Sequence, residues 1–501
     1  MKNAISIILI LSVLFSFISC AGSSSDAPVP DDTTLAEDTQ DTSSETQNED
    51  TTIYYEPDLL PEKLDFGGRT ITFLTDGTPE TSEISIAEIT NEPVNDSLFY
   101  RERYVEEKLN VEIVDIPQGD FISQLRKVHT ADEDAYQVAD HNTFEFSTFV
   151  FEHYFMDLSE FEYLHLDSPW WSQKFNEKAR IDEKSYIVTG PITLSLNRNI
   201  YAMFYNKKLA EDYSGRIPEL SDLYGLVDSG LWTYDKLVEL CGDVYEDING
   251  NQERDGEDVY GLGIVGSVEL DPIWSCFDIN ILSRTDDGWF ELDVNTDKMY
   301  NAFDMMSRLF FDINGVFCPG YEEDLLKDLA VKFAGDTLLF HLNELEYTEK
   351  PVFRNMQSDY GVLPFPKYDE SQKEYYSYAH DSYVSFAILV TDPQPEQTAA
   401  VLEALASYAY RETEPTYLNI ALKGKYMSDP QSRKMIDILV DNVKLDTAWI
   451  YLKSLANSYP SNFRKVVYQK TGSYASAHES MKQGVTRSIK TYKLSYESKL
   501  K

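Results

Sequence analysis

The sequence predicts an α/β protein in which two lobes with long insertions meet at a cleft. Strand-like and helix-like segments alternate along the chain, a pattern typical of parallel sheets covered by helices. After an acidic N-terminal segment roughly 440 residues remain, which is enough for two large lobes or two to three small domains. The chain shows no short-period repeat and no heptad pattern, so neither a repeat architecture nor a coiled coil is expected.

The first alternation lies between residues 70 and 139. A strand is expected at Thr70–Thr75, after a Gly-Gly turn, and a helix begins after Pro93 in the segment VNDSLFYRERYVEEKL. A strand at Val111–Ile116, a helix at Phe121–Thr130 and a short strand at Tyr136–Ala139 complete the unit. This β-α-β-α-β order predicts a parallel sheet.

The alternation returns from residue 200. The strand-like Ile200–Tyr205 runs into the helical NKKLAEDY, and Thr233 is a candidate cap for the helix YDKLVELCGDVYED, which leads straight into an acidic loop. Further strands are expected at Tyr260–Val265, at Tyr360–Leu363 and in SYVSFAILV, and further helices at Asp297–Phe311, Lys327–Ala334, Glu396–Tyr410 and through most of the chain after Pro430. This second run of elements predicts the second lobe.

Residues 1–20 predict a secretory signal of the lipoprotein kind. Lys2 precedes the apolar run Ile5–Ile18, which is too short to span a membrane comfortably. The run ends at Ser19-Cys20 and resembles a bacterial lipoprotein signal, in which such a cysteine is lipidated, although Phe17 stands where that motif usually has Leu. The alternative is an ordinary signal peptide with an incidental cysteine.

Residues 21–57 predict a disordered acidic tether. They are mostly Ser, Thr, Asp, Glu, Gln and Pro, with no Lys or Arg, so they have too little apolar surface to offset the entropy of ordering. A lipid on Cys20 and this tether would hold a globular body at the extracytoplasmic face of the cell membrane, anchored rather than embedded.

The composition is that of an acidic exported protein. The 43 Lys and Arg residues against 86 Asp and Glu residues give a formal net charge of -43, which argues against nucleic acid as a partner. Besides Cys20 the chain has Cys241, Cys276 and Cys318, which cannot all pair within one chain and are too few for a disulfide scaffold. We expect a monomer with buried cysteines.

The segment DINGNQERDGED, Asp247–Asp258, predicts a structural calcium site. Calcium takes six to eight oxygen ligands, and alternate positions of an EF-type loop supply them. Those positions hold Asp247, Asn249, Asn251, Glu253 (through its backbone carbonyl), Asp255 and Asp258. Gln252 replaces the usual sixth-position glycine, and the last ligand is Asp rather than Glu. The alternative is a solvated acidic loop that holds no metal.

Candidate ligand-binding residues combine aromatic rings with carboxylates and amides, the groups that recognise the C–H faces and hydroxyls of sugars. The candidates are Asp140, His141 and Asn142 in ADHNTFEF, Trp274 in DPIWSCFD, Asn343 and Glu344 in FHLNELEY, Asp381 and Tyr383 in AHDSYVS, and Trp449 in DTAWIY. Each has an alternative role as a capping, core or surface residue. Trp232 and Trp170-Trp171 are expected to pack in the core, although Trp171 could reach the cleft. No Ser/His/Asp order, HExxH, CxxC or P-loop indicates an enzyme.

Several stretches together resemble the extracellular solute-binding proteins of ABC importers, of the carbohydrate type. They are the lipoprotein start, VNDSLFYRERYVEEKLNVEI, the strand leading into YNKKLAE, LWTYDKL, the acidic loop followed by VYGL, AVKFAGDTLLF and YGVLPFPKYDE, in this order. The resemblance implies a periplasmic-binding-protein-like fold with two lobes, each a mainly parallel sheet flanked by helices, joined by hinge strands near Tyr186–Leu196 and Tyr375–Ile388. The first lobe would take residues 58–190 with 380–430, and the second 191–379 with 431–501.

The resemblance further implies capture of a polar solute, foremost an oligosaccharide or sugar derivative, and its delivery to the permease subunits of an ABC transporter. A peptide is the nearest variant. Two other functions stay open. A secreted glycoside hydrolase is one, because paired carboxylates are easily found in so acidic a chain. A calcium-stabilised surface adhesion protein is the other, and the absence of repeats counts against it.

Overall fold

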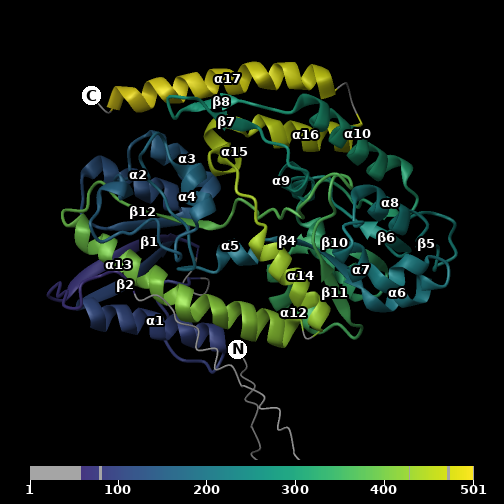
Figure 1. Ribbon diagram of the computed structural model, residues 1–501, viewed down its shortest axis with the longest axis horizontal. Helices are drawn as coiled ribbons and strands as arrows, with labels where there is room; N and C mark the ends of the chain where they lie inside the picture. Colours follow the sequence, from purple (N-terminus) through teal and green to yellow (C-terminus); the bar gives the residue numbers. More distant parts are fainter. Residues whose placement is uncertain (1–57, 78–81, 428, 471–473, 500–501) are drawn as a thin grey trace, which may run out of the picture. The chain divides into compact units, whose positions relative to one another are not determined.

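The computed structural model describes residues 58–77, 82–427, 429–470 and 474–499, which form an α/β body with two main sheets (Figure 1). The predicted signal with Cys20 and the predicted tether lie outside the described residues. We define the first lobe as the sheet β12-β3-β1-β2 with its helices, and the second lobe as the sheet built around β4, β10 and β6 with its helices. This is the two-lobed α/β architecture that the sequence predicts.

The first sheet contains the early strands that the sequence predicts. Its strands are β1 (Arg69–Asp76), β2 (Val111–Gln118), β3 (Val138–Asn142) and β12 (Val384–Ile388). Both β2 and β3 pair parallel with β1. The chain enters β12 from a linker, residues 375–383, which arrives at the end where β3 finishes. Val384 therefore pairs with Asn142, and β12 runs antiparallel to β3.

The second sheet is mixed rather than mainly parallel. Its strands are β4 (Tyr201–Asn206), β5 (Tyr245–Glu246), β6 (Val259–Gly263), β9 (Val316–Phe317), β10 (Leu338–Glu344) and β11 (Tyr360–Leu363). β6 pairs parallel with β10 and β9, whereas β4 runs antiparallel to its neighbours β10 and β11. The chain enters β4 from a second linker, residues 186–200, so Tyr201 at the start of β4 pairs with Glu344 at the end of β10. A separate hairpin consists of β7 (Leu282–Arg284) and β8 (Phe290–Leu292).

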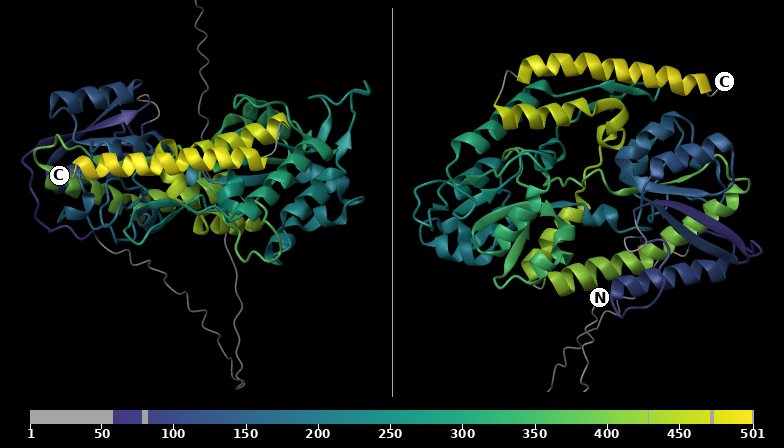
Figure 2. Two further views of the ribbon diagram at one scale, coloured as in Figure 1. Left: turned by 90° about the horizontal axis from the view of Figure 1, so that it is seen from above. Right: turned by 180° about the vertical axis from the view of Figure 1, so that it is seen from behind.

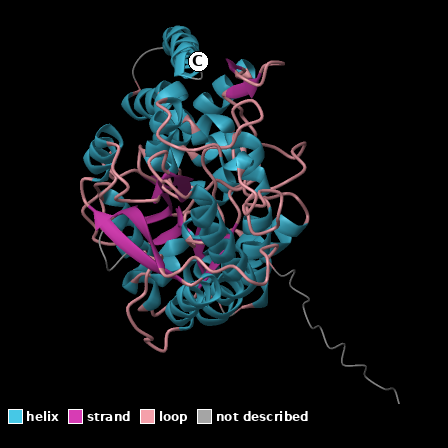
Figure 3. Ribbon diagram, turned by 90° about the vertical axis from the view of Figure 1, so that its left-hand side faces the viewer, coloured by secondary structure: helices cyan, strands magenta, loops and turns pink. Residues whose placement is uncertain are grey.

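Helices pack against both sheets, as Figures 1 and 3 show. The helices up to β10 are α1 (Pro93–Leu109), α2 (Phe121–Ala131), α3 (Thr143–Phe151), α4 (Gln173–Ala179), α5 (Ser195–Arg198), α6 (Lys207–Ser214), α7 (Leu223–Asp228), α8 (Tyr234–Gly242), α9 (Pro272–Cys276), α10 (Thr296–Asp312) and α11 (Leu325–Ala334). The later ones are α12 (Pro351–Arg354), α13 (Pro395–Tyr408), α14 (Pro430–Asp441), α15 (Thr447–Ile450), α16 (Ser458–Gln469) and α17 (Tyr474–Lys499). Thr233 caps α8, as predicted, by accepting the backbone N–H of Lys236.

Short 3₁₀ and π-helical turns join these elements. The 3₁₀ turns are η1 (Leu158–Glu160), η2 (Pro218–Asp222), η3 (Val268–Leu270) and η4 (Leu345–Glu349), and the π-helical segments are η5 (Ala409–Thr413), η6 (Thr416–Tyr426) and η7 (Leu452–Ala456). The helix expected to end at Tyr410 thus continues as π-helix, and η6 contacts both α1 and α14.

The C-terminal helices divide their contacts between the lobes. α14 packs on β11 of the second lobe, whereas α15 packs on α3 and α4 of the first. α17 contacts both α3 and α10, and Figures 1 and 2 show it lying alongside α16. The expected assignment of the whole segment 431–501 to the second lobe stays a prediction, since these contacts do not follow one lobe.

The core buries most of the aromatic residues. Trp232 is fully buried and its indole N–H donates to the carbonyl of Pro364 at 2.8 Å. Cys241 and Cys276 are buried and Cys318 is half-buried, all three free, and burial raises the pKa of the Cys241 thiol to about 12. Among the described helices, none is both long and apolar enough to cross a membrane.

Candidate functional site

Strand ends from both lobes converge on one cavity, which we name the cleft pocket. In open α/β sheets, ligands bind beyond the carboxyl ends of the strands. β1 ends at Asp76 and β3 at Asn142, and both residues line this cavity of about 320 Å³. Asn199 of the segment before β4 and Glu346 of η4, just after β10, line it from the other side. The predicted candidates Asp140, His141 and Asn142 all belong to this lining.

Asp140 holds the two strand ends together. Its carboxylate accepts a hydrogen bond from the Thr75 hydroxyl at 2.7 Å, and its side chain is buried. Burial, followed by the nearby charges of Asp115 and Asp76, raises the pKa of Asp140 well above its usual range. Burial at the base of the cleft pocket therefore favours the neutral form of the Asp140 carboxyl over its ionised form.

His141 and Asn142 fix the start of α3 beside the cavity. The His141 ring lies edge-on to Phe121, with centroids 4.3 Å apart, and its Nδ1 lies 3.3 Å from Asp76. Nδ1 also accepts the backbone N–H of Asn142 at 2.7 Å, and burial lowers the pKa of His141, so the ring is neutral at pH 7. The Asn142 side chain caps α3 by accepting the N–H of Glu145 at 2.9 Å.

A second polar group lies near the linker that precedes β12. We name it the carboxylate cluster; it consists of Asp271, Glu344, Asp381, His380 and Arg464. Nδ1 of His380 lies 3.9 Å from Glu344 and 3.8 Å from Asp381, and Arg464 binds Asp271 through Nε at 2.7 Å and through its second nitrogen. Glu344 and Asp381 were predicted; the other three were not.

The carboxylate cluster is poorly solvated, and burial raises the pKa values of its acidic groups. Burial first, and then the negative charge of Glu346, raises the pKa of Glu344 to about 8. Burial raises the pKa of Asp381 and of Asp271 to about 6, although Arg464 opposes both shifts. The side chains of Glu344 and Asp381 keep 19% and 15% of their exposure, so a ligand can reach them.

The other predicted candidates are core residues in this structure. Trp274 is 1% exposed and its ring lies 5.3 Å from that of Phe463, and Trp449 lies edge-on to Tyr378 at 5.0 Å. Tyr383 and Asn343 are also buried; the Asn343 amide contacts His341 and accepts the N–H of Glu344. None of these four side chains lines the cleft pocket, so their role in binding stays a prediction that this conformation does not favour.

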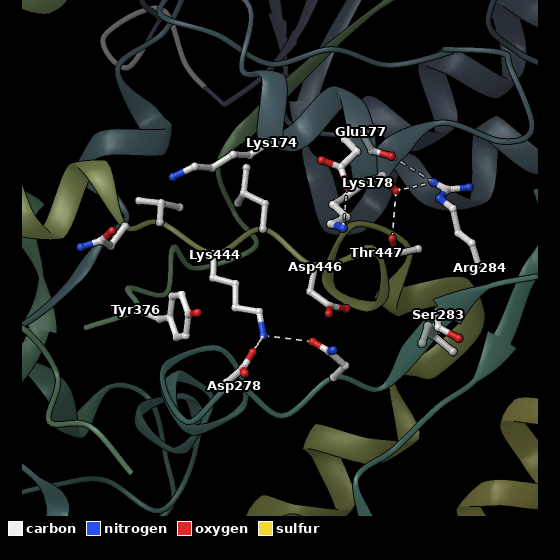
Figure 4. Close-up of a pocket in the computed structure, with 15 residues that line it drawn as sticks. Lys174, Glu177, Lys178, Asp278, Ser283, Arg284, Tyr376, Lys444, Asp446 and Thr447 are labelled. Carbon is white, nitrogen blue, oxygen red and sulfur yellow. Dashed lines mark hydrogen bonds and ion pairs between the residues drawn. The ribbon is translucent and has the colours of Figure 1, made fainter. Parts of the chain in front are cut away.

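A larger cavity of about 520 Å³, the linker pocket, lies against residues 442–447 (Figure 4). Its lining includes Lys178 of α4, Arg284 of β7 and Lys444, which bonds Asp278 and, at 3.0 Å, Asn280. Arg284 donates to the backbone carbonyl of Lys178 at 2.8 Å. These cationic side chains already have bonding partners within the chain, and the carboxyl ends of the strands of the first sheet lie elsewhere. We therefore favour the cleft pocket as the ligand site.

The acidic loop connects two antiparallel strands. α8 ends at Gly242, and β5 then pairs with β6, with Tyr245 opposite Tyr260. The prediction that the helix leads straight into the loop is therefore wrong. Val244 is buried and the chain extends there to add a strand to the sheet edge, which a continuous helix would prevent.

Side chains of the acidic loop fold back on its backbone. Asp247, Asn249 and Asn251 each accept backbone N–H groups two to five residues further on, at 2.7 to 2.9 Å. The amides of Asn249 and Asn251 donate to Asp255 at 3.3 and 2.7 Å. Asp258 is fully buried: Oδ2 accepts the Asp255 N–H at 3.2 Å, and Oδ1 has no hydrogen-bond partner.

The loop carboxylates do not converge on one point in this conformation. Across the described residues, no three His, Cys, Asp or Glu side chains are grouped to hold a metal ion. A cation in the loop would therefore depend on amide and backbone oxygens as well as on Asp255 and Asp258, which is the oxygen-rich donor set that calcium prefers.

Comparison with solved structures identifies the fold. The sugar-binding protein MalE from Xanthomonas citri is 12% identical, with a TM-score of 0.55, and the match covers 85% of this chain and 99% of MalE. A cyclic alpha-maltosyl-1,6-maltose binding protein from Arthrobacter globiformis is 13% identical, with a TM-score of 0.55, and the match covers 85% of this chain and 100% of that protein. An ABC substrate-binding protein from Listeria monocytogenes, in complex with cycloalternan, is 13% identical, with a TM-score of 0.51, and the match covers 85% of this chain and 98% of that protein.

The sequence itself matches no family model and no curated protein. At 12 to 13% identity the structural likeness concerns the fold alone. On that likeness and on the two linked sheets, the chain has the two-lobed fold of periplasmic-binding-protein-like solute-binding proteins.

Proposed function

We propose that this protein captures a saccharide between its lobes and delivers it to the permease of an ABC importer, without acting on it as an enzyme. The observation that carries the proposal is the convergence of strand ends from both lobes on the cleft pocket and the carboxylate cluster. The fold likeness to sugar-binding proteins supports it. Amides, carboxylates and a neutral imidazole are groups that bond hydroxyls.

In this proposal, both lobes hold the ligand. Asn142 and Asp76 of the first lobe and Glu346 of the second line the cleft pocket and would contact it directly. Glu344 and Asp381 do not line this cavity, but they belong to the neighbouring carboxylate cluster and would contact the ligand from there. Because the linkers enter their sheets at the cleft, a rotation of one lobe on the other would close these groups around a ligand.

The test is ligand-induced closure. A panel of oligosaccharides and peptides is screened by thermal unfolding, since a ligand that binds only the folded state raises its stability with the logarithm of concentration. For any hit, solution scattering should show a smaller radius of gyration. Asp381→Asn should weaken binding by about tenfold or more, as expected for loss of a charged hydrogen bond. The matched control is Asp304→Asn on the exposed face of α10, which should leave binding unchanged.

Three results would contradict parts of the proposal. Cleavage of a bound oligosaccharide would support a glycoside hydrolase instead. Binding of peptides but of no sugar would remove the carbohydrate assignment and leave the importer. Equal loss of binding in Asp381→Asn and Asp304→Asn would show that the carboxylate cluster is not the site.

We further propose that the acidic loop binds calcium as a structural ion. The unpartnered Oδ1 of buried Asp258 and the carboxylate of Asp255 supply two of the oxygens, and Asp247, Asn249 and Asn251 surround the same turn. We also propose that Cys20 carries a lipid that anchors the protein to the extracytoplasmic face of the cell membrane, on the strength of the sequence pattern at residues 1–20.

A further inference from the structure

The linker pocket gathers positive charge in a chain that is strongly acidic overall. The chain carries 86 Asp and Glu residues against 43 Lys and Arg residues, yet four cationic residues line this one cavity: Lys174, Lys178, Arg284 and Lys444. They come from α4 of the first lobe, from β7 and from the segment 442–447 (Figure 4). The cavity measures about 520 Å³, a volume within the range of small-molecule sites.

Two of these cations have only backbone carbonyls as hydrogen-bond partners. Lys174 donates to the carbonyl of Asp441, and Arg284 donates to the carbonyls of Lys178 at 2.8 Å and Gly288 at 3.1 Å. Among the residues that the structure describes, no carboxylate pairs with either cation. A carbonyl satisfies an N–H group but does not cancel its charge. Burial lowers the pKa of Arg284, as expected for a half-buried cation without a counterion.

The carboxylates that line the same cavity do not supply this missing counterion. Asp278 is bonded by Lys444. Asp446 accepts a backbone N–H as the cap of α15, and burial raises the pKa of its carboxyl. Glu177 pairs with Lys178 at 2.8 Å, but its side chain is 72% exposed, and exposed pairs of this kind contribute little. The cavity therefore keeps a positive character.

The other polar groups around the cavity are of the kind that recognises hydroxyls. Asn280 and Asn442 supply amides, Ser283 and Thr447 supply hydroxyls, and Tyr376 supplies a half-buried ring. Amides and hydroxyls form hydrogen bonds with sugar hydroxyls, and an aromatic ring packs against the C–H face of a sugar. The linker pocket thus combines positive charge with groups suited to a saccharide.

We propose that the linker pocket is a second binding site, which takes a sugar acid and binds its carboxylate through Lys178 and Arg284. This goes beyond the proposed function and does not depend on which saccharide the cleft pocket holds. A guanidinium has five N–H donors, so Arg284 can bond a carboxylate while it keeps its carbonyl partners. A neutral sugar would leave the positive charge uncompensated, and a small inorganic anion would leave the amides and hydroxyls without partners.

The experiment is titration calorimetry at about pH 7, where a sugar carboxylate is ionised. The probes are digalacturonate, galactobiose, citrate and inorganic phosphate. Digalacturonate should bind at least tenfold more tightly than galactobiose, which has the same rings without the charge, and its affinity should fall as the salt concentration rises. Citrate and phosphate have the charge without the sugar rings, and they should also bind at least tenfold more weakly than digalacturonate.

Substitutions of two adjacent residues should change the affinity for digalacturonate in opposite directions. Lys178→Gln removes a cation and should weaken binding about tenfold or more, as expected for loss of a charged hydrogen bond. Glu177→Gln frees Lys178 from its pair and should strengthen binding about twofold to fivefold. The matched control is Lys236→Gln, which removes a cation outside the pocket that pairs with Glu239 on α8 and should bind as wild type. Lys174→Gln asks the same question if Lys178→Gln does not fold.

Several results would overturn the proposal. Equal affinity of the wild type for galactobiose and digalacturonate would show that charge is not recognised. An unchanged affinity in Lys178→Gln, or a weaker one in Glu177→Gln, would place the bound sugar acid outside the linker pocket. Citrate or phosphate that binds as tightly as digalacturonate would remove the assignment to a sugar acid. None of these results contradicts the proposed function, which is tested by closure of the lobes around a ligand in the cleft.

Discussion

Replacing Asp258 with asparagine should remove the response of the protein to calcium. Asp258 is fully buried at the end of the acidic loop, Tyr245 and the Asp255 N–H bond one of its oxygens, and the other oxygen has no partner. A calcium ion would satisfy that oxygen. Asparagine keeps the volume of the side chain but removes its charge, so it separates the loss of a ligand from the loss of packing.

The expected effect of the ion can be calculated. At about 10 mM calcium, a site with a Kd of about 10⁻⁴ M stabilises the folded state by about 2.7 kcal/mol. Unfolding entropy is about 2.1 cal/mol/K per residue, or roughly 0.9 kcal/mol/K for roughly 440 residues, so the melting temperature should rise by about 3 °C. A weaker site with a Kd of about 10⁻³ M would give about half this shift.

The assay is calorimetric unfolding in chelator and in calcium. Wild type should show the shift and Asp258→Asn should not. Glu253→Gln is the matched control, because position 7 contributes only its backbone carbonyl and the Glu253 side chain is exposed. Identical wild-type curves in chelator and calcium would leave only the metal-free acidic loop. A full shift in Asp258→Asn would place the ion elsewhere.

Other perturbations test the anchor, the core and the cleft. Cys20→Ala should release the protein from membranes into the soluble fraction; unchanged partition would contradict a lipid anchor. Trp274→Ala should lower the free energy of unfolding by about 3–5 kcal/mol in denaturant titration, because its ring is buried against Phe463. Wild-type stability with weakened sugar binding would support a stacking role instead. Glu344 has a pKa raised to about 8, so the folded state keeps its proton at pH values where the unfolded chain has lost it. The stability that Glu344 contributes below its unfolded pKa is therefore lost as the pH rises through about 8. The melting temperature of Glu344→Gln should therefore rise relative to that of wild type as the pH increases from about 4.5 to 8. A difference in melting temperature that stays constant over this range would contradict the raised pKa.

Helices and strands with a local sequence pattern could be predicted from the sequence. Elements that form only by pairing with another strand could not. β11 has the expected bounds, Tyr360–Leu363, and α2 differs by one residue from the expected Phe121–Thr130. β5 is two residues long and exists because Tyr245 pairs with Tyr260. Nothing local in the sequence distinguishes such a strand from the end of the preceding helix.

The candidate site divides in the same way. Asp140, His141 and Asn142 could be predicted because they end a short strand of a parallel sheet. Arg464 and Asp271 are 193 residues apart and meet only because α16 packs on η3, so no spacing in the sequence indicates them. Trp274 and Trp449 illustrate the converse, since a core indole and a sugar platform have the same sequence signature.

The linkers place the carboxylate cluster at the point where the two lobes would move relative to each other. β4 and β12 both start at the cleft, which is why each runs antiparallel to the strand that ends beside it. The backbone N–H of His380 donates to the carbonyl of Asn199 at 2.9 Å, so the two linkers are joined at the cluster itself. Asp381 is the next residue, and its carbonyl accepts the N–H of Phe144 at the start of α3. A ligand bound between Glu344 and Asp381 would therefore connect the end of a second-lobe strand to a linker residue held by the first lobe, and closure and binding would share the same few hydrogen bonds.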